Sequence, residues 1–155
     1  MEYIPFESIP YFAECSAVVS SAGFHLVELH VVPQSRTVRV TAVIASKDPE
    51  KDISLSDCSK AHRALTPKII ALLKINEDDV SMELCSPGTE RNFKNAAEFA
   101  VFTGRGVRVW SKAAGGWISG TVKSADKSQV VLETEDSSEK AVAYSDIAKA
   151  KFIHS

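Results

Sequence analysis

The sequence has few cysteines, and none of them stands in a metal-binding pattern. The chain has three cysteines, an odd number: Cys15, Cys58 and Cys85. They are widely and irregularly spaced and form no C-x-x-C pair. This spacing argues against a zinc or redox site and indicates reduced, partly buried thiols in a cytosolic protein. We therefore expect a cytoplasmic location and no bound metal.

Long apolar runs are also absent. No run approaches the ~18 residues of a membrane span, and the first seven residues carry two glutamates and no basic residue, unlike a secretory signal. We expect no membrane partner. Hydrophobic residues at 45% and charged residues at 25% are ordinary for a globular protein, and 155 residues allow one domain or two small ones.

Local signatures of catalysis are missing as well. The chain has no G-x-x-x-x-G-K-[ST] loop and no G-x-S-x-G elbow, and Gly104-Arg105-Gly106 lacks the third glycine of a dinucleotide loop. Cys58 and His62 stand four apart and could share a metal, but Cys58 belongs to an apolar helical stripe, which favours packing. We expect a binding protein with no catalytic residues and no cofactor.

The first part of the chain alternates helical and strand periodicities in the order α-β-β-α-β. We expect a helix that begins at Ser8 as N-cap and ends at Gly23, strands over 25–32, 37–45 and 80–85, and a second helical region that starts at Ser54 with a capping-box-like spacing. Pro67 has no N–H and disfavours α geometry at Thr66, which predicts two short helices rather than one.

The pattern changes after Arg91. Residues 93–103 predict a short helical linker, and five short strands follow over 107–111, 117–124, 129–135, 141–144 and 150–153. Gly115-Gly116 predicts a hairpin turn, and Gly120 predicts a bend within a strand. The expected fold class is α+β, with an α-β-β-α-β domain over 1–90 and a small SH3-like or Sm-like β-barrel over 91–155.

Charge is unevenly divided between these parts. Residues 1–90 hold 8 basic and 13 acidic side chains, whereas residues 91–155 hold 10 and 7. This division favours partners of opposite charge on the two parts, although imbalances of this size also occur in proteins that bind neither nucleic acid nor basic proteins.

Basic side chains gather around the linker and the first two strands of the second part. These are Arg91, Lys94, Arg105, Arg108, Lys112 and Lys123. Trp110 and Trp117 flank the Gly115-Gly116 hairpin, where an indole could stack on a base, anchor a peptide, or serve only in the core or as a hairpin staple.

The strand over 80–85 runs into the turn Ser86-Pro87-Gly88. Pro87 ends the strand ladder, and Gly88 supplies the positive φ that a type II turn needs at its third position. The helix–sheet order of the first part resembles a KH-type RNA-binding domain, but no two glycines stand three apart, so the GXXG clamp is absent.

Five ordered segments together resemble the bacterial ribosome maturation factor RimP family. They are Gly23-Phe24-His25-Leu26-Val27-Glu28-Leu29, the helix from Ser54 to Leu65, Glu83-Leu84-Cys85-Ser86-Pro87-Gly88, Thr103-Gly104-Arg105-Gly106-Val107 and Asp146-Ile147-Ala148-Lys149-Ala150. The family usually continues Ser-Pro-Gly with Leu-Asp-Arg-Pro, whereas this chain has Thr89-Glu90-Arg91-Asn92.

The resemblance implies a monomeric, non-enzymatic factor that binds immature small ribosomal subunits. The implied partners are small-subunit ribosomal RNA and a basic small-subunit ribosomal protein of the decoding region. Candidate contact residues are Ser86, Pro87, Gly88, Arg91, Lys94, Arg105 and Arg108, with Glu133 and Glu135 for the basic protein. The alternative is a peptide- or RNA-binding regulatory module of Sm-like or SH3-like type with no ribosomal role.

Overall fold

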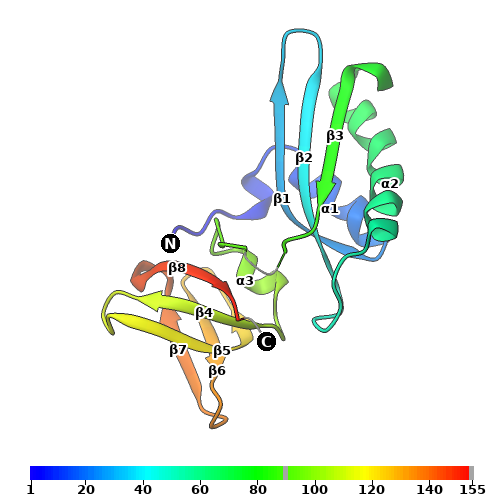
Figure 1. Cartoon of the computed structure of the whole chain (residues 1–155). Coiled ribbons are helices and arrows are strands. Elements are labelled where there is room, and N and C mark those ends of the chain that lie inside the picture. Colours follow the sequence, from blue (N-terminus) through cyan, green and yellow to red (C-terminus); the bar gives the residue numbers. More distant parts are fainter. Residues whose placement is uncertain (89–90, 154–155) are drawn as a thin grey trace. The chain divides into compact units, whose positions relative to one another are not determined.

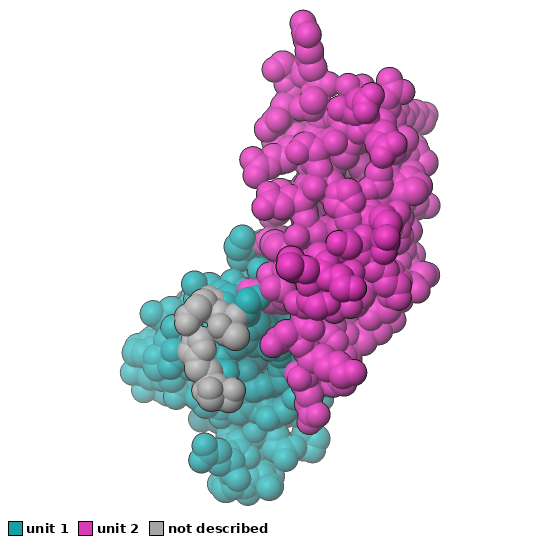
Figure 2. Space-filling model, turned by 45° about the vertical axis from the view of Figure 1, so that its right-hand side comes forward, with its two compact units in different colours: residues 1–5, 88–155 teal, residues 6–87 magenta. Residues whose placement is uncertain are grey.

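The computed structural model describes residues 1–88 and 91–153, and the chain divides into two compact units (Figure 2). The N-terminal unit is Phe6–Pro87. The C-terminal unit combines Met1–Pro5 with Gly88–Ser155. Asn95 joins the two segments of the C-terminal unit, because its Oδ1 accepts from the Ile4 N–H at 2.9 Å and its Nδ2 donates to the Ile4 carbonyl at 2.8 Å. The first five residues thus lie outside the unit that follows them in sequence.

The N-terminal unit has the predicted order of helices and strands (Figure 1). Its elements are α1 (Phe12–Ser21), β1 (Phe24–Pro33), β2 (Val38–Ser46), α2 (Leu55–Leu73) and β3 (Val80–Cys85). β1 and β2 pair antiparallel, and β2 and β3 pair parallel with α2 as the crossover. Val40, Ala42 and Ile44 of β2 are buried at alternate positions in a core shared with both helices.

The first helix starts later than the sequence predicts. α1 begins at Phe12, and Ser8 lies instead in a short 3-10 helix over Phe6–Ser8. The Phe6 and Phe12 rings stack at 4.5 Å and hold the intervening residues in a turn, in which the Phe12 N–H donates to the Ile9 carbonyl. The predicted end is confirmed, because Gly23 follows the helix with φ +102°.

α2 is one continuous helix, so the prediction of two short helices was wrong. Ser54 is its N-cap and forms the capping box with Asp57 as predicted. Pro67 lies inside the helix and cannot donate to the Arg63 carbonyl, but both residues are exposed, so water can solvate that carbonyl. Burial of Leu65 and Ile69 on either side of Pro67 outweighs the lost hydrogen bond.

The C-terminal unit is one antiparallel sheet with a short helix. It contains α3 (Glu98–Val101), β4 (Gly106–Ser111), β5 (Gly116–Ala125), β6 (Gln129–Glu133), β7 (Glu139–Ala143) and β8 (Ile147–Phe152). The strand order is β7-β6-β5-β4-β8, and the predicted α+β class is confirmed. Gly120 is required by close approach of β6, since a Cβ there would lie 2.7 Å from the Glu133 carbonyl oxygen.

The predicted linker belongs to the core of the C-terminal unit. Phe93, Phe99 and Phe102 are at most 6% exposed. The Phe93 ring lies 5.0 Å from Phe99, 5.2 Å from Phe102 and 5.2 Å from Phe152 of β8. Helix α3 therefore packs on the sheet as part of this unit, a result that depends on contacts made more than 50 residues along the chain.

Candidate functional site

The turn Ser86-Pro87-Gly88 stands where the two compact units meet in sequence. Pro87 is the last residue of the N-terminal unit and Gly88 the first of the C-terminal unit. Gly88 has φ +70°, the left-handed conformation that the turn was predicted to need. Ser86 and Gly88 are exposed. Thr89 and Glu90, where this chain departs from the family's usual turn sequence, lie outside the described residues.

Arg91, predicted to contact RNA, lies inside the C-terminal unit. Its side chain is 7% exposed, and its Nε donates to Glu98 Oε1 at 2.8 Å. Glu98 Oε2 accepts from the backbone N–H groups of Lys94 and Asn95, each at 3.0 Å. Arg91 and Glu98 therefore form a buried ion pair that fixes the start of α3, and this geometry gives Arg91 a structural role.

Two other predicted residues also lie near this helix. The Arg105 guanidinium sits 4.3 Å from the centroid of the Phe152 ring and 5.9 Å from that of Phe102, so it covers the aromatic core. Lys94 is exposed, and its backbone N–H belongs to the Glu98 network. The predicted basic residues therefore do not share one surface, because Arg91 and Arg105 face the core side of the unit.

Arg108, in contrast, belongs to a group of five side chains on the outer surface of the sheet. Along β4, Val107 and Val109 are buried, so Arg108 and Trp110 point to the opposite surface. Strand register pairs Trp110 with Trp117 on β5 and with Lys149 on β8, and pairs Arg108 with Lys151. We call Arg108, Trp110, Trp117, Lys149 and Lys151 the basic–tryptophan face.

Cations surround the indoles of this face. Arg108 Cζ lies 4.6 Å from the centroid of Trp117, and the Nζ atoms of Lys149 and Lys151 lie 5.3 and 5.5 Å from it. Lys149 Nζ is also 5.7 Å from Trp110. The two indoles meet edge to face, with centroids 5.5 Å apart and an interplanar angle of 86°. These cation–π contacts stabilise the three cations beside the indoles, but they do not neutralise the positive charge.

No carboxylate of the described residues pairs with these three cations. Arg108 Nε is buried and has no hydrogen-bond acceptor among the described residues. A buried donor without a partner is costly. The three cations of the basic–tryptophan face therefore carry positive charge that no described carboxylate neutralises, which favours binding of an anion.

The hairpin that carries the two tryptophans is held by Asp146. Its Oδ2 accepts from the Ser111 hydroxyl at 2.5 Å, and its Oδ1 accepts from the Ala113 N–H at 2.8 Å. These hydrogen bonds, that of Ser111 foremost, hold the pKa of the Asp146 carboxyl below its ordinary value. Ser111 is buried at the end of β4, so Asp146 fixes the turn directly after Trp110 and before Trp117.

Residues 14–90 match the family model of the RimP N-terminal domain. The chain belongs to the RimP family. This family consists of ribosome maturation factors, so the resemblance predicted from the sequence is confirmed. In this RimP-family chain, the family-like segment Asp146-Ile147-Ala148-Lys149-Ala150 supplies both the hairpin-fixing carboxylate and one lysine of the basic–tryptophan face.

Lys149 and Lys151 were not predicted from the sequence as site residues. Both lysines alternate with the buried Ala150, a strand signal that places them on one surface. That they join Arg108 and the tryptophans depends on the pairing of β8 with β4, about 40 residues apart in sequence. Lys123, which the sequence grouped with the basic set, instead forms an ion pair with Glu139.

Glu133 and Glu135 are exposed, at and just after the end of β6. The neighbouring Asp136 belongs to the turn itself, since its Oδ1 accepts from the Thr134 hydroxyl at 2.5 Å and from the Ser138 N–H at 3.2 Å. These bonds, that of Thr134 foremost, lower the pKa of Asp136. The β6–β7 hairpin thus presents Glu133 and Glu135 on a fixed turn.

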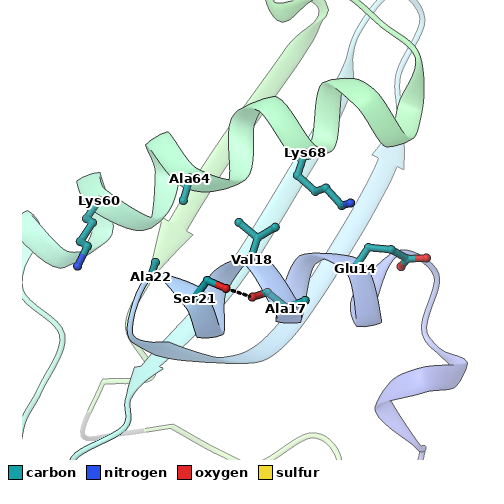
Figure 3. Close-up of a pocket in the computed structure, with 8 residues that line it drawn as sticks. All are labelled: Glu14, Ala17, Val18, Ser21, Ala22, Lys60, Ala64 and Lys68. Carbon is teal, nitrogen blue, oxygen red and sulfur yellow. Dashed lines mark hydrogen bonds between the residues drawn. The ribbon is translucent and has the colours of Figure 1, made fainter.

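A groove lies between α1 and α2 of the N-terminal unit (Figure 3). It is lined by Glu14, Ala17, Val18, Ser21, Ala22, Lys60, Ala64 and Lys68. Small side chains form its floor, and the charged side chains stand apart from one another at its margin. Within the described residues, no three His, Cys, Asp or Glu side chains could hold a metal ion, and no helix is long and apolar enough to cross a membrane.

Proposed function

We propose that this protein assists maturation of the small (30S) ribosomal subunit. It binds immature subunits transiently in the cytoplasm, acts as a monomer and catalyses no reaction. The observation that carries the proposal is the RimP N-terminal domain over residues 14–90. The absence of local catalytic signatures from the sequence supports the non-enzymatic role.

The two units divide the partners by charge. The N-terminal unit has 8 basic and 11 acidic side chains. This acidic excess favours binding of a basic small-subunit protein of the decoding region. The C-terminal unit, as an SH3-like or Sm-like barrel, meets ribosomal RNA. The cations of the basic–tryptophan face support this second assignment. Glu133 and Glu135 offer a second contact to the basic protein, and the KH-like N-terminal unit does not read bases, because it has no GXXG loop.

Deletion of the gene tests the proposal. The deletion strain should contain fewer mature small subunits, an excess of unassociated large subunits and unprocessed small-subunit RNA, measured on sucrose gradients and by primer extension. Complementation with the intact gene is the control. A normal gradient profile at both low and high growth temperature contradicts the proposal.

A second candidate is a regulatory module that anchors a peptide. The paired indoles of Trp110 and Trp117 favour it, because tryptophan pairs anchor apolar side chains as well as bases. Capture of partners from growing cells separates the candidates. A maturation factor sediments with immature subunits, is absent from mature ones and dissociates at high salt, whereas a peptide receptor keeps its partner after ribosomes are removed.

A further inference from the structure

We infer that the basic–tryptophan face binds single-stranded RNA, with a backbone phosphate held among Arg108, Lys149 and Lys151 and a neighbouring base stacked on the tryptophan pair. This inference deepens the proposed function, on which it rests for the source of the RNA. It selects one of the three roles that the sequence left open for Trp110 and Trp117.

The cations indicate the phosphate. Three positive groups lie within 5.5 Å of the centroid of one indole, and no carboxylate of the described residues pairs with them. Like charges this close repel one another, and a phosphate between them would remove that repulsion. Phosphate oxygens would also accept charge-assisted hydrogen bonds from the lysine ammonium groups.

The indoles indicate an unpaired base. Trp110 and Trp117 are half-buried on a sheet surface and pair with each other across β4 and β5, and Trp110 also pairs with Lys149 of β8. Single-stranded nucleic acids bind to such surfaces, because an unstacked base offers its ring to an aromatic side chain while the backbone follows the cations. In a duplex the bases are already stacked on one another, so only the cations would remain in use.

The edge of the sheet argues against a peptide that binds by strand addition. β8 carries both lysines and is an edge strand of the sheet, but residues 92 and 93 already contact its outer side. The Phe93 N–H donates to the Ala150 carbonyl at 2.9 Å, and Asn92 forms a bridge with Lys151. A peptide that added a strand here would have to displace the Phe93–Ala150 hydrogen bond, which disfavours strand addition beside Lys149 and Lys151.

Direct fluorescence titration tests the inference on the full chain. Trp110 and Trp117 are the only tryptophans, so quenching of their emission reports on the basic–tryptophan face itself. The probes are a mixed-sequence RNA 12-mer, the same RNA annealed to its complement, and an acidic peptide of equal net charge. We expect the single strand to bind at least 10-fold more tightly than the duplex or the peptide in 0.1 M salt.

Substitutions locate the contact. In K149A/K151A the affinity for the single strand should fall at least 10-fold, and the salt slope should fall by about 0.7, since one phosphate contact on a single strand contributes ~0.7. W110L should weaken binding roughly 5- to 150-fold, the range found for loss of one stacked base. K140A removes an exposed lysine from β7 and should change nothing.

Each result decides the matter. Equal binding of single strand and duplex, preference for the acidic peptide, or unchanged RNA binding in K149A/K151A would overturn the inference. The lysine variants keep the test valid if W110L does not fold. Failure here, with a maturation defect in the deletion strain, leaves the proposed function standing. A normal deletion strain with intact RNA binding would contradict the proposed function and leave the RNA-binding inference standing.

Discussion

The buried ion pair between Arg91 and Glu98 offers a quantitative test of the structure. Arg91→Met keeps an unbranched apolar stem but removes the guanidinium and its charge, leaving the Glu98 carboxylate 2% exposed and hydrogen-bonded to the Lys94 and Asn95 N–H groups. Removing one partner of a buried pair costs about 3–5 kcal/mol, whereas an exposed pair is worth ~0–1 kcal/mol. We expect a loss of about 3 kcal/mol.

Urea denaturation followed by tryptophan fluorescence measures this loss of stability in the C-terminal unit. Both tryptophans lie on β4 and β5, so their signal reports on the C-terminal unit even if the two units unfold separately. The same change should lower Tm by roughly 10 °C or more. High salt should change the loss little, because buried charges are poorly screened.

Lys140→Met is the matched control, since it replaces another long basic side chain with methionine at an exposed position on β7. Glu98→Gln should be destabilising as well, because it leaves the Arg91 charge without a counter-ion in the pair. RNA binding by folded Arg91→Met should equal that of the unaltered protein. A stability loss below about 0.5 kcal/mol, or selective loss of RNA binding in the folded variant, would refute the structural role of Arg91.

Three further predictions concern single positions. Gly120→Ala should cost about 1–3 kcal/mol in urea denaturation because its Cβ meets the Glu133 carbonyl oxygen, whereas Gly116→Ala, with nothing within 4 Å, should be close to neutral. Pro67→Ala should stabilise α2 by about 1–3 kcal/mol in denaturation followed by circular dichroism, because it restores the N–H that donates to the Arg63 carbonyl; destabilisation would contradict the account of that helix. Burial raises the pKa of Cys15 from its ordinary 9.0 to about 11, so the thiol's contribution to stability is complete below pH 9 and is lost as pH rises towards 11. Iodoacetamide should alkylate the exposed Cys85 before the buried Cys15. Rapid alkylation of Cys15 at pH 8 in the folded protein would be inconsistent with this burial.

Much of the local structure follows from the sequence alone. The alternation of Val38, Val40, Ala42 and Ile44 identifies β2 and its buried side, because a strand with one buried surface repeats every two residues. Ser54 and Asp57 determine the start of α2, and Gly23 determines the end of α1. The family resemblance has the same origin, since its segments are local runs of residues.

The errors of the sequence analysis occur where distant packing outweighs a local preference. Pro67 favours a helix break, but the burial of Leu65 and Ile69 in one core keeps α2 continuous. Residues 93–103 have the composition of a linker, but their phenylalanines pack against Phe152. In both cases the buried apolar area is set by residues far along the chain.

The candidate site divides in the same way. Arg108, Trp110 and Trp117 could be placed on neighbouring strands from their local sequence, because a short glycine turn joins those strands. Lys149 and Lys151 complete the basic–tryptophan face, and Arg91 is buried with Glu98, through contacts that form only when the C-terminal unit folds. Arginine and lysine carry their charge wherever they lie, and only strand register and burial determine whether that charge meets a carboxylate within the protein or stays available for a partner.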